Sequence, residues 1–277
     1  MLETIAYDAL RTLAGLLTGL AFFRILELAF PQRNAAPPER NGLGLRIWLT
    51  YVAAQIALTS VVLALMDSSG TPQVNPSSFL GLPTWAAVAI AGVAVILVKD
   101  FLFYVEHRIQ HRWLWRWHEP HHAIRNLSAT NSWHHWSEIL MFAVFVSLPM
   151  SLLSPAFGPR PFILGVLLNW MPIYLHSSTS LQMGRLRWLI VDSRYHRIHH
   201  SLDPKHFEKN FGAATPLWDW LFGTLYMPAK DEWPDVGLAG VDEPTSVGEW
   251  SLLPWRKRQL QEALQENTPD EPLRRAA

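Results

Sequence analysis

Histidine is concentrated in one stretch of this 277-residue chain. All 12 histidines lie between His107 and His206, and chance does not explain such clustering. Imidazole nitrogen is a good ligand for Fe, Zn, Cu and Ni. The chain contains no cysteine, which excludes disulfides, iron–sulfur clusters and cysteine-ligated zinc. Any bound metal must therefore be held by imidazole or by oxygen.

Eight of the histidines form three short boxes with metal-ligand spacing. The first box is HxxxH, whose spacing of four places both imidazoles on one face of a helix. The second and third boxes are both HxxHH, in which three positions converge and the doubled histidine can reach a second ion. The boxed residues are His107 and His111, then His118, His121 and His122, then His196, His199 and His200. A single HxxxH is weak evidence for a metal, whereas the three boxes together are strong evidence.

The number of boxed histidines indicates how many ions they hold. Crowding eight neutral imidazoles without metal would carry a large desolvation cost. One ion binds roughly four to six ligands, so eight or more nitrogens predict two ions with few positions left for O₂. The side chains include no acid, base or nucleophile that could attack an unactivated C–H bond. Oxidation of such a bond would therefore need a redox metal.

Longer sequence runs surround the boxes: FLFYVEHRIQH, WRWHEPHH, NSWHHWSE, RYHRIHHSLDPKHFEKNFG and LWDWLFGTLY. These runs, over about residues 101–226, resemble the fatty acid hydroxylase superfamily of sterol desaturase type. The resemblance implies an all-α, membrane-bound, non-haem di-iron oxidoreductase that uses O₂ on lipids. It implies two Fe ions as cofactors, with Zn as an alternative in isolated protein. It also implies a lipid substrate in the bilayer and a separate electron-transfer protein, such as a reductase, a ferredoxin or a cytochrome.

The same resemblance implies the site residues. It assigns the eight boxed histidines as metal ligands, and His135 and His176 as two further ones. His135 matches a family position that usually reads His-Pro-x-Glu, although tryptophan stands here in place of proline. Glu138 is assigned to the catalytic site, as an acceptor for a ligand imidazole or as a ligand. His134 has no family counterpart, and no role is predicted for His206.

Two further features follow the last box. Asn210, Phe211 and Gly212 either support the metal helices or form a turn with a glycine at positive φ. Asp219 either accepts a hydrogen bond from a ligand imidazole or caps a helix.

Apolar stretches must position these residues. A helix needs roughly 20 mostly apolar residues to cross a bilayer, and five stretches approach this requirement: 13–30, 47–66, 83–98, 139–157 and 161–175. Arg24 and Glu27 interrupt the first stretch and are predicted to pair with each other. The fold predicted is therefore an all-α integral membrane bundle of about four to five membrane segments. A cytoplasmic helical cap would hold the histidine-rich dimetal site.

Loop charges predict the orientation of this multi-pass bundle. The linker 31–46 contains Arg33, Arg40 and Arg46, whereas the linker 67–82 contains no lysine or arginine. The positive-inside rule therefore places linker 31–46 in the cytoplasm, and three crossings bring the histidine region to the same face. The first residues lack the features of a cleaved secretory signal, so the stretch from Leu13 is expected to be retained.

The predicted organisation has three parts: N-terminal transmembrane helices at 1–100, a catalytic region at 101–226 with a membrane hairpin at 139–175, and a polar tail at 227–277. The favoured function is O₂-dependent hydroxylation or desaturation of a membrane lipid or sterol-like substrate. A membrane metal-dependent hydrolase is the second hypothesis, although HExxH is absent and HEPH has the wrong spacing. A metal transporter is the third, although its ligands would be expected at mid-membrane. The net charge of +0 gives no support for a nucleic-acid partner.

Overall fold

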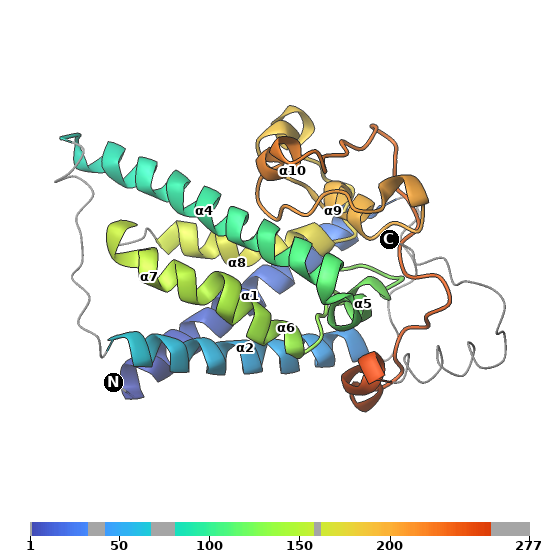
Figure 1. Cartoon of the computed structure of the whole chain (residues 1–277), viewed down its shortest axis with the longest axis horizontal. Coiled ribbons are helices and arrows are strands. Elements are labelled where there is room, and N and C mark those ends of the chain that lie inside the picture. Colours follow the sequence, from blue (N-terminus) through green and yellow to red (C-terminus); the bar gives the residue numbers. More distant parts are fainter. Residues whose placement is uncertain (1, 33–41, 68–80, 158–161, 256–277) are drawn as a thin grey trace.

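The structure is a computed structural model that describes residues 2–32, 42–67, 81–157 and 162–255. Within these ranges the regular elements are helices, and the β-structure consists of isolated bridges such as Pro31 with Thr179. The prediction of an all-α fold is confirmed. Figure 1 shows long helices lying side by side, with shorter helices gathered toward one end of the bundle.

The long elements are α1 (Leu2–Ala29), α2 (Leu43–Asp67), α4 (Thr84–Trp113) and α8 (Phe162–His176), together with one segment that combines α6 (Ser137–Phe142), η1 (Ala143–Ser147) and α7 (Leu148–Phe157). η1 is a single π-helical turn. Pro149 follows it and has no N–H for the carbonyl four residues earlier, a local cause for the irregular turn. α1 packs on both α2 and α8, and its Phe23 ring stacks on Tyr174 of α8.

Two helices in the described part of the chain are long and apolar enough to cross a membrane. They are α4 and residues Ala9–Ala29 of α1, and only 22% of the apolar window of each is buried within the protein. Shorter apolar stretches occur at Leu43–Leu58 and Ser137–Leu153. Residues 158–161 and most of the linkers 31–46 and 67–82 lie outside the described residues.

The charged residues within α1 form the predicted pair. Arg24 donates to Glu27 Oε2 at 2.5 Å. The other oxygen, Oε1, accepts the backbone N–H of Ala129 at 2.7 Å and that of Ser178 at 2.8 Å. Glu27 therefore fixes α1 to two loops of the catalytic region as well as pairing with Arg24.

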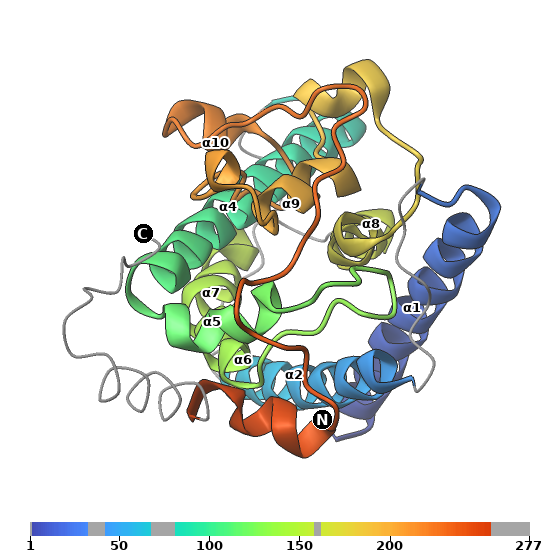
Figure 2. The ribbon, with the colours of Figure 1, turned by 90° about the vertical axis from the view of Figure 1, so that its right-hand side faces the viewer.

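Short helices form the end of the bundle that Figure 2 faces: α5 (Trp115–His122), η2 (Gly184–Trp188), α9 (Ser193–His199), η3 (Pro204–His206) and α10 (Leu217–Leu221). α9 begins at Asp192, whose side chain accepts the N–H of Tyr195 at 3.0 Å and so caps the helix. Asp100 of α4 fixes the loop that precedes α10, because it accepts the N–H groups of Ala213, Ala214 and Thr215 at 2.8 to 3.0 Å.

The segment after α10 packs back onto the cap. Residues 247–255 are helical, and Trp250 is only 1% exposed in a cluster with Ile47 and Trp133. Arg116 of α5 also donates to the carbonyl of Pro254 at 3.0 Å. Part of the region predicted as a polar tail is therefore integral to the fold, and residues 256–277 lie outside the described residues.

Candidate metal centre

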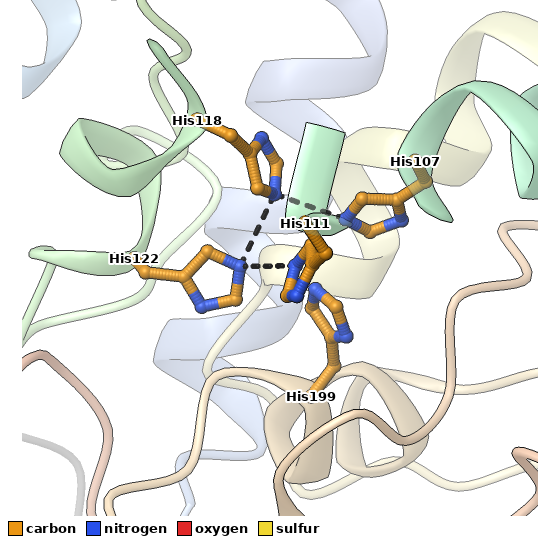
Figure 3. A group of neighbouring side chains, drawn as sticks. All are labelled: His107, His111, His118, His122 and His199. Carbon is orange, nitrogen blue, oxygen red and sulfur yellow. Dashed lines mark hydrogen bonds between the residues drawn. The ribbon is translucent and has the colours of Figure 1, made fainter. Parts of the chain in front are cut away.

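Nine histidines lie in two groups at the cap end of the bundle. The first group contains His107, His111, His118, His122 and His199, and the second contains His121, His176, His196 and His200. In each group the ligand atoms lie within 4.8 Å of one another. Figure 3 shows the first group, in which rings from α4, α5 and α9 point their nitrogens toward a common centre.

Helical spacing decides how each HxxHH box divides between the groups. In α5, His118 and His122 are four residues apart and share the first group, while His121 belongs to the second. The third box reverses this arrangement, because His196 and His200 share the second group and His199 belongs to the first. Each HxxHH box therefore contributes to both groups.

The distances within the groups suit nitrogens that share one ion. Nε2 of His118 lies 3.0 Å from Nε2 of His107 and 3.1 Å from Nε2 of His122. In the second group, Nε2 of His176 lies 3.1 Å from Nε2 of His121 and 3.0 Å from that of His196. Two nitrogens bound at right angles to one ion at about 2.1 Å would lie about 3.0 Å apart.

The second nitrogen of many of these rings faces an oxygen that can only accept. Nδ1 of His107 lies 3.0 Å from the carbonyl of Phe211, and Nδ1 of His121 lies 2.8 Å from that of Trp133. Nδ1 of His176 lies 2.7 Å from the carbonyl of Pro172. Each Nδ1 therefore carries the proton, and in a neutral ring Nε2 is left with an unshared electron pair.

Burial keeps these rings neutral. It lowers the pKa of His121 well below its usual value, and the neighbouring His134 and His176 rings add to the effect. Burial likewise lowers the pKa of His199 to about 3. His121 and His176 therefore direct two electron pairs at each other across 3.1 Å. Such a contact is repulsive unless a cation lies between the nitrogens, so the donor set fits bound metal.

His199 gives independent support for a bound cation. Its Nδ1 donates to the carbonyl of Lys209 at 2.8 Å, while its buried Nε2 has no partner in the described part of the chain. Buried polar atoms without a partner are uncommon, and this one belongs to the first group.

Glu138 lies directly behind the first group. Its Oε2 accepts from Nδ1 of His118 at 2.9 Å and from Nδ1 of His134 at 3.1 Å. The carboxylate thus orients a candidate ligand in the way that supporting groups orient metal-binding histidines. The His134 ring stacks on His121 of the second group with centroids 3.8 Å apart. Glu138 therefore contacts the first group, and His134, which is bonded to it, contacts the second.

The structure does not bring His135 to either group. Its Nδ1 contacts Ser137 Oγ at 2.7 Å, and its Nε2 faces the carbonyl of Ser251 at 3.2 Å. The start of α6 turns His135 toward the C-terminal segment and its neighbour His134 toward the site. His206 is also remote from both groups, because its ring lies between Ser201 and Glu232.

Sequence reasoning missed Glu208, whose Oε1 lies 3.1 Å from Nδ1 of His111. Glu208 has φ of 57° and Asn210 has φ of 60°. The residues at positive φ in this turn are therefore Glu208 and Asn210, and Gly212 is not one of them. Gly212 is needed for space, since a Cβ there would lie 2.6 Å from the carbonyl oxygen of Thr215.

Asp219 supports the site through the backbone and contacts no ligand imidazole. It is fully buried and accepts the N–H of Phe211 at 2.9 Å, that of Gly212 at 2.7 Å, and the hydroxyls of Tyr195 and Thr224 at 2.7 Å each. Because the carbonyl of Phe211 faces His107, Asp219 holds the acceptor that orients this ring.

A cavity of ≈ 350 Å³ opens beside the histidines. His107, His118, His121, His176 and His196 line one part of it, and apolar side chains of α1, α2, α4 and α8 line much of the rest. Along α4 the lining runs from Ile96 to Gln110, which is about 21 Å at the rise of an α-helix. The cavity therefore extends along α4, and part of it meets both groups.

Comparison with known proteins agrees with this site. Residues 92–224 match the family described as fatty acid hydroxylase, a range that contains all nine clustered histidines. No solved structure matches the chain significantly.

Curated relatives match 48 to 68% of the chain. The chain is 28% identical over 158 residues to an ornithine lipid hydroxylase of Rhizobium tropici, covering 55% of this chain and 47% of the relative. It is 26% identical over 136 residues to an alkylglycerol monooxygenase of Xenopus tropicalis, covering 48% of this chain and 30% of the relative. It is 27% identical over 205 residues to a very-long-chain aldehyde decarbonylase of Oryza sativa subsp. indica, covering 68% of this chain and 30% of the relative.

The chain thus spans less than half the length of each of these three relatives. A hydroxylase and a monooxygenase are oxidoreductases, the enzyme class predicted from the sequence. Residues 92–224 match the fatty acid hydroxylase family, in agreement with the resemblance that the sequence runs around the histidine boxes indicated.

Proposed function

We propose that this protein is a multi-pass membrane oxygenase that hydroxylates or desaturates a membrane lipid at a di-iron centre. The observation that carries the proposal is the meeting of two histidine groups with part of a mostly apolar cavity that extends along α4. A volume of ≈ 350 Å³ falls in the range of small-molecule sites, about 300–1,000 Å³. The names of the relatives, two of them lipid-modifying oxygenases, support a lipid substrate for this chain.

The two groups would hold one ion each, through nine imidazole nitrogens. Imidazole alone does not select iron over zinc, so the choice of iron rests on the family. When bound, iron would supply the one-electron and O₂ chemistry that side chains lack. Hydroxylation inserts one oxygen atom of O₂ into a C–H bond, and the other leaves as water with two electrons and two protons. A separate electron-transfer protein would deliver the electrons.

The chain itself would orient the ligands and exclude water. Carbonyls such as those of Phe211 and Trp133 fix the ring tautomers, and Glu138 fixes His118. The apolar walls of the cavity would hold an acyl or alkyl chain beside the site, which fixes the distance between the reacting carbon and the metals.

The membrane arrangement is also part of the proposal. α1 and α4 direct large apolar side chains outward, among them Leu28 at 72% and Trp85 at 77% exposure, as lipid-facing helices do. α2 and the α6–α8 hairpin would complete about four to five membrane segments. The arginines of linker 31–46 favour the cytoplasmic side for that linker, and the metal site would lie on the same face.

The test is metal and oxygen analysis of protein purified from iron-replete cells. We expect about two iron ions per chain and O₂ consumption that requires an added reductant. Lipid profiling of cells with and without the gene should show a lipid that has gained one oxygen atom or lost two hydrogen atoms. A single tightly held zinc, with no O₂ dependence, would refute the oxygenase and favour the metal-dependent hydrolase.

A further inference from the structure

The cavity wall beside the histidines carries a polar network that the ligand set does not explain. Gln110 Nε2 donates to Glu106 Oε1 at 2.6 Å and to Glu138 Oε2 at 3.3 Å. Glu138 in turn contacts His118 of the first group. Three hydrogen bonds, through Gln110 and Glu138, thus connect the Glu106 carboxyl group to a candidate ligand.

Tyr51 of α2 joins the same region from the other side. Its ring contacts His134 with centroids 5.6 Å apart, and His134 stacks on His121 of the second group. Tyr51, Glu106 and Gln110 all line the cavity. They form what we term the polar subsite, which lies next to both histidine groups.

The polar subsite is incompletely satisfied. Glu106 is only 2% exposed, and Gln110 bonds one of its two oxygens. In the part of the chain that the structure describes, neither Glu106 Oε2 nor the Tyr51 hydroxyl makes a hydrogen bond with protein. A carboxyl oxygen and a hydroxyl that lack hydrogen-bond partners at a cavity wall are costly to bury, so these atoms are arranged to meet a polar group in the cavity.

A plain hydrocarbon does not complement this wall. A methylene or terminal methyl beside Glu106 would leave the carboxylate without its missing partner. A hydroxyl or amino group would donate to Glu106 Oε2, and a hydroxyl could also accept from Tyr51. The remaining hydrocarbon would then extend along Ile56, Ile96 and Leu168, which line the cavity farther from the histidines.

We propose that Tyr51, Glu106 and Gln110 bind a hydroxyl or amino group of the lipid, so that oxidation falls on the carbon bearing that group or on its neighbour. This inference rests on the proposed oxygenase function and narrows its substrate to lipids with a hydrogen-bond donor near the reacting carbon. It predicts that the far end of the hydrocarbon chain is not oxidised.

The first test is the structure of the product. Fragmentation of the oxygenated lipid should place the new oxygen or double bond next to a hydroxyl or amino group, and should identify which of the two is present. A product oxidised at mid-chain or at the terminal methyl would overturn the inference and leave the oxygenase function intact. Absence of any O₂-dependent product would instead overturn the proposed function.

The second test compares Glu106→Leu with Glu106→Gln in the full-length enzyme, using the identified lipid and an analogue that lacks its hydroxyl or amino group. Leaving the polar group of the lipid without its Glu106 partner should lower kcat/KM of Glu106→Leu about ten- to hundredfold with iron content retained. Glu106→Gln keeps an acceptor oxygen and should lose less. The wild-type enzyme should strongly prefer the lipid over its analogue, and Glu106→Leu should not.

If Glu106 has a purely structural role, Glu106→Leu will lower kcat/KM for both substrates equally and leave the preference unchanged. That result would refute the subsite. If Glu106→Leu fails to fold or to hold iron, Tyr51→Phe provides the same comparison. Removal of that hydroxyl should also reduce the preference for the donor-bearing lipid, and an unchanged preference would refute the subsite.

Discussion

Replacing Asp219 with asparagine should loosen the loop that orients His107. The carboxylate accepts four hydrogen bonds, two at each oxygen: Phe211 N–H and the Thr224 hydroxyl at Oδ1, and Gly212 N–H and the Tyr195 hydroxyl at Oδ2. An asparagine amide places an NH₂ group where one oxygen stood. The hydroxyl on that side can rotate and accept, but the backbone N–H cannot.

The cost follows from this geometry. One buried backbone N–H loses its acceptor, which costs about 1–3 kcal/mol, and the remaining bonds weaken because their acceptor is no longer charged. Removing a buried charge offsets part of the loss, so we expect a net destabilisation of about 2–4 kcal/mol. At about 2–4 °C per kcal/mol for a chain of this size, Tm should fall by roughly 5–15 °C. Because Phe211 then holds His107 less firmly, metal affinity should also fall about 10- to 100-fold.

The assay is thermal unfolding of the detergent-solubilised protein, together with metal titration of Asp219→Asn. Tyr195→Phe is the matched control, because it removes one of the four bonds and leaves both backbone N–H groups bonded to the carboxylate. It should cost about 1–2 kcal/mol. If Asp219→Asn melts like the wild type and binds metal equally well, then the loop does not depend on this carboxylate and the reasoning is wrong.

Three further predictions, two of them with a matched control substitution, test the architecture. His176→Ala removes one of four histidines in the second group and should lower metal content toward about one ion per chain. The control His135→Ala should retain the wild-type metal content. Equal metal loss in both variants would return His135 to the ligand set. Gly19→Ala places a Cβ 2.7 Å from the Trp170 ring of α8 and should destabilise the folded protein by about 1–3 kcal/mol. The control Gly15→Ala places a Cβ with nothing within 4 Å and should leave Tm unchanged or raise it. Trp250→Ala should cost about 3–5 kcal/mol if the C-terminal segment is integral, and an unchanged Tm would show that it is not.

Much of the fold was predictable because its signals are local. Apolar stretches mark the long helices, and the spacing within HxxxH and HxxHH places histidines on common helix faces. The Arg24–Glu27 pair also follows from a spacing of three residues and is confirmed. The roles of Asp100 and Asp219 were not predictable in the same way, since Asp100 binds backbone groups 113 to 115 residues farther along the chain.

The ligand set shows a similar limit. Ten histidines were predicted as ligands, and the structure brings nine of them together and leaves His135 outside both groups. Neighbouring residues were harder to distinguish, because a one-residue shift at the start of α6 decides whether His134 or His135 faces the site. Glu208 lies on an irregular turn, and its contact with His111 depends on a positive φ that no helical pattern indicates.

The crossing of the HxxHH boxes has a structural consequence that spacing alone does not give. α5 supplies His121 to the second group, and α9 supplies His199 to the first. Neither group is complete unless α5 and α9 are packed in one relative position. Correct packing of the cap therefore assembles both groups together, and a displacement of either helix would disturb both. Such coupling would suit the proposed di-iron reaction, because a cap that is only partly assembled would present neither group intact.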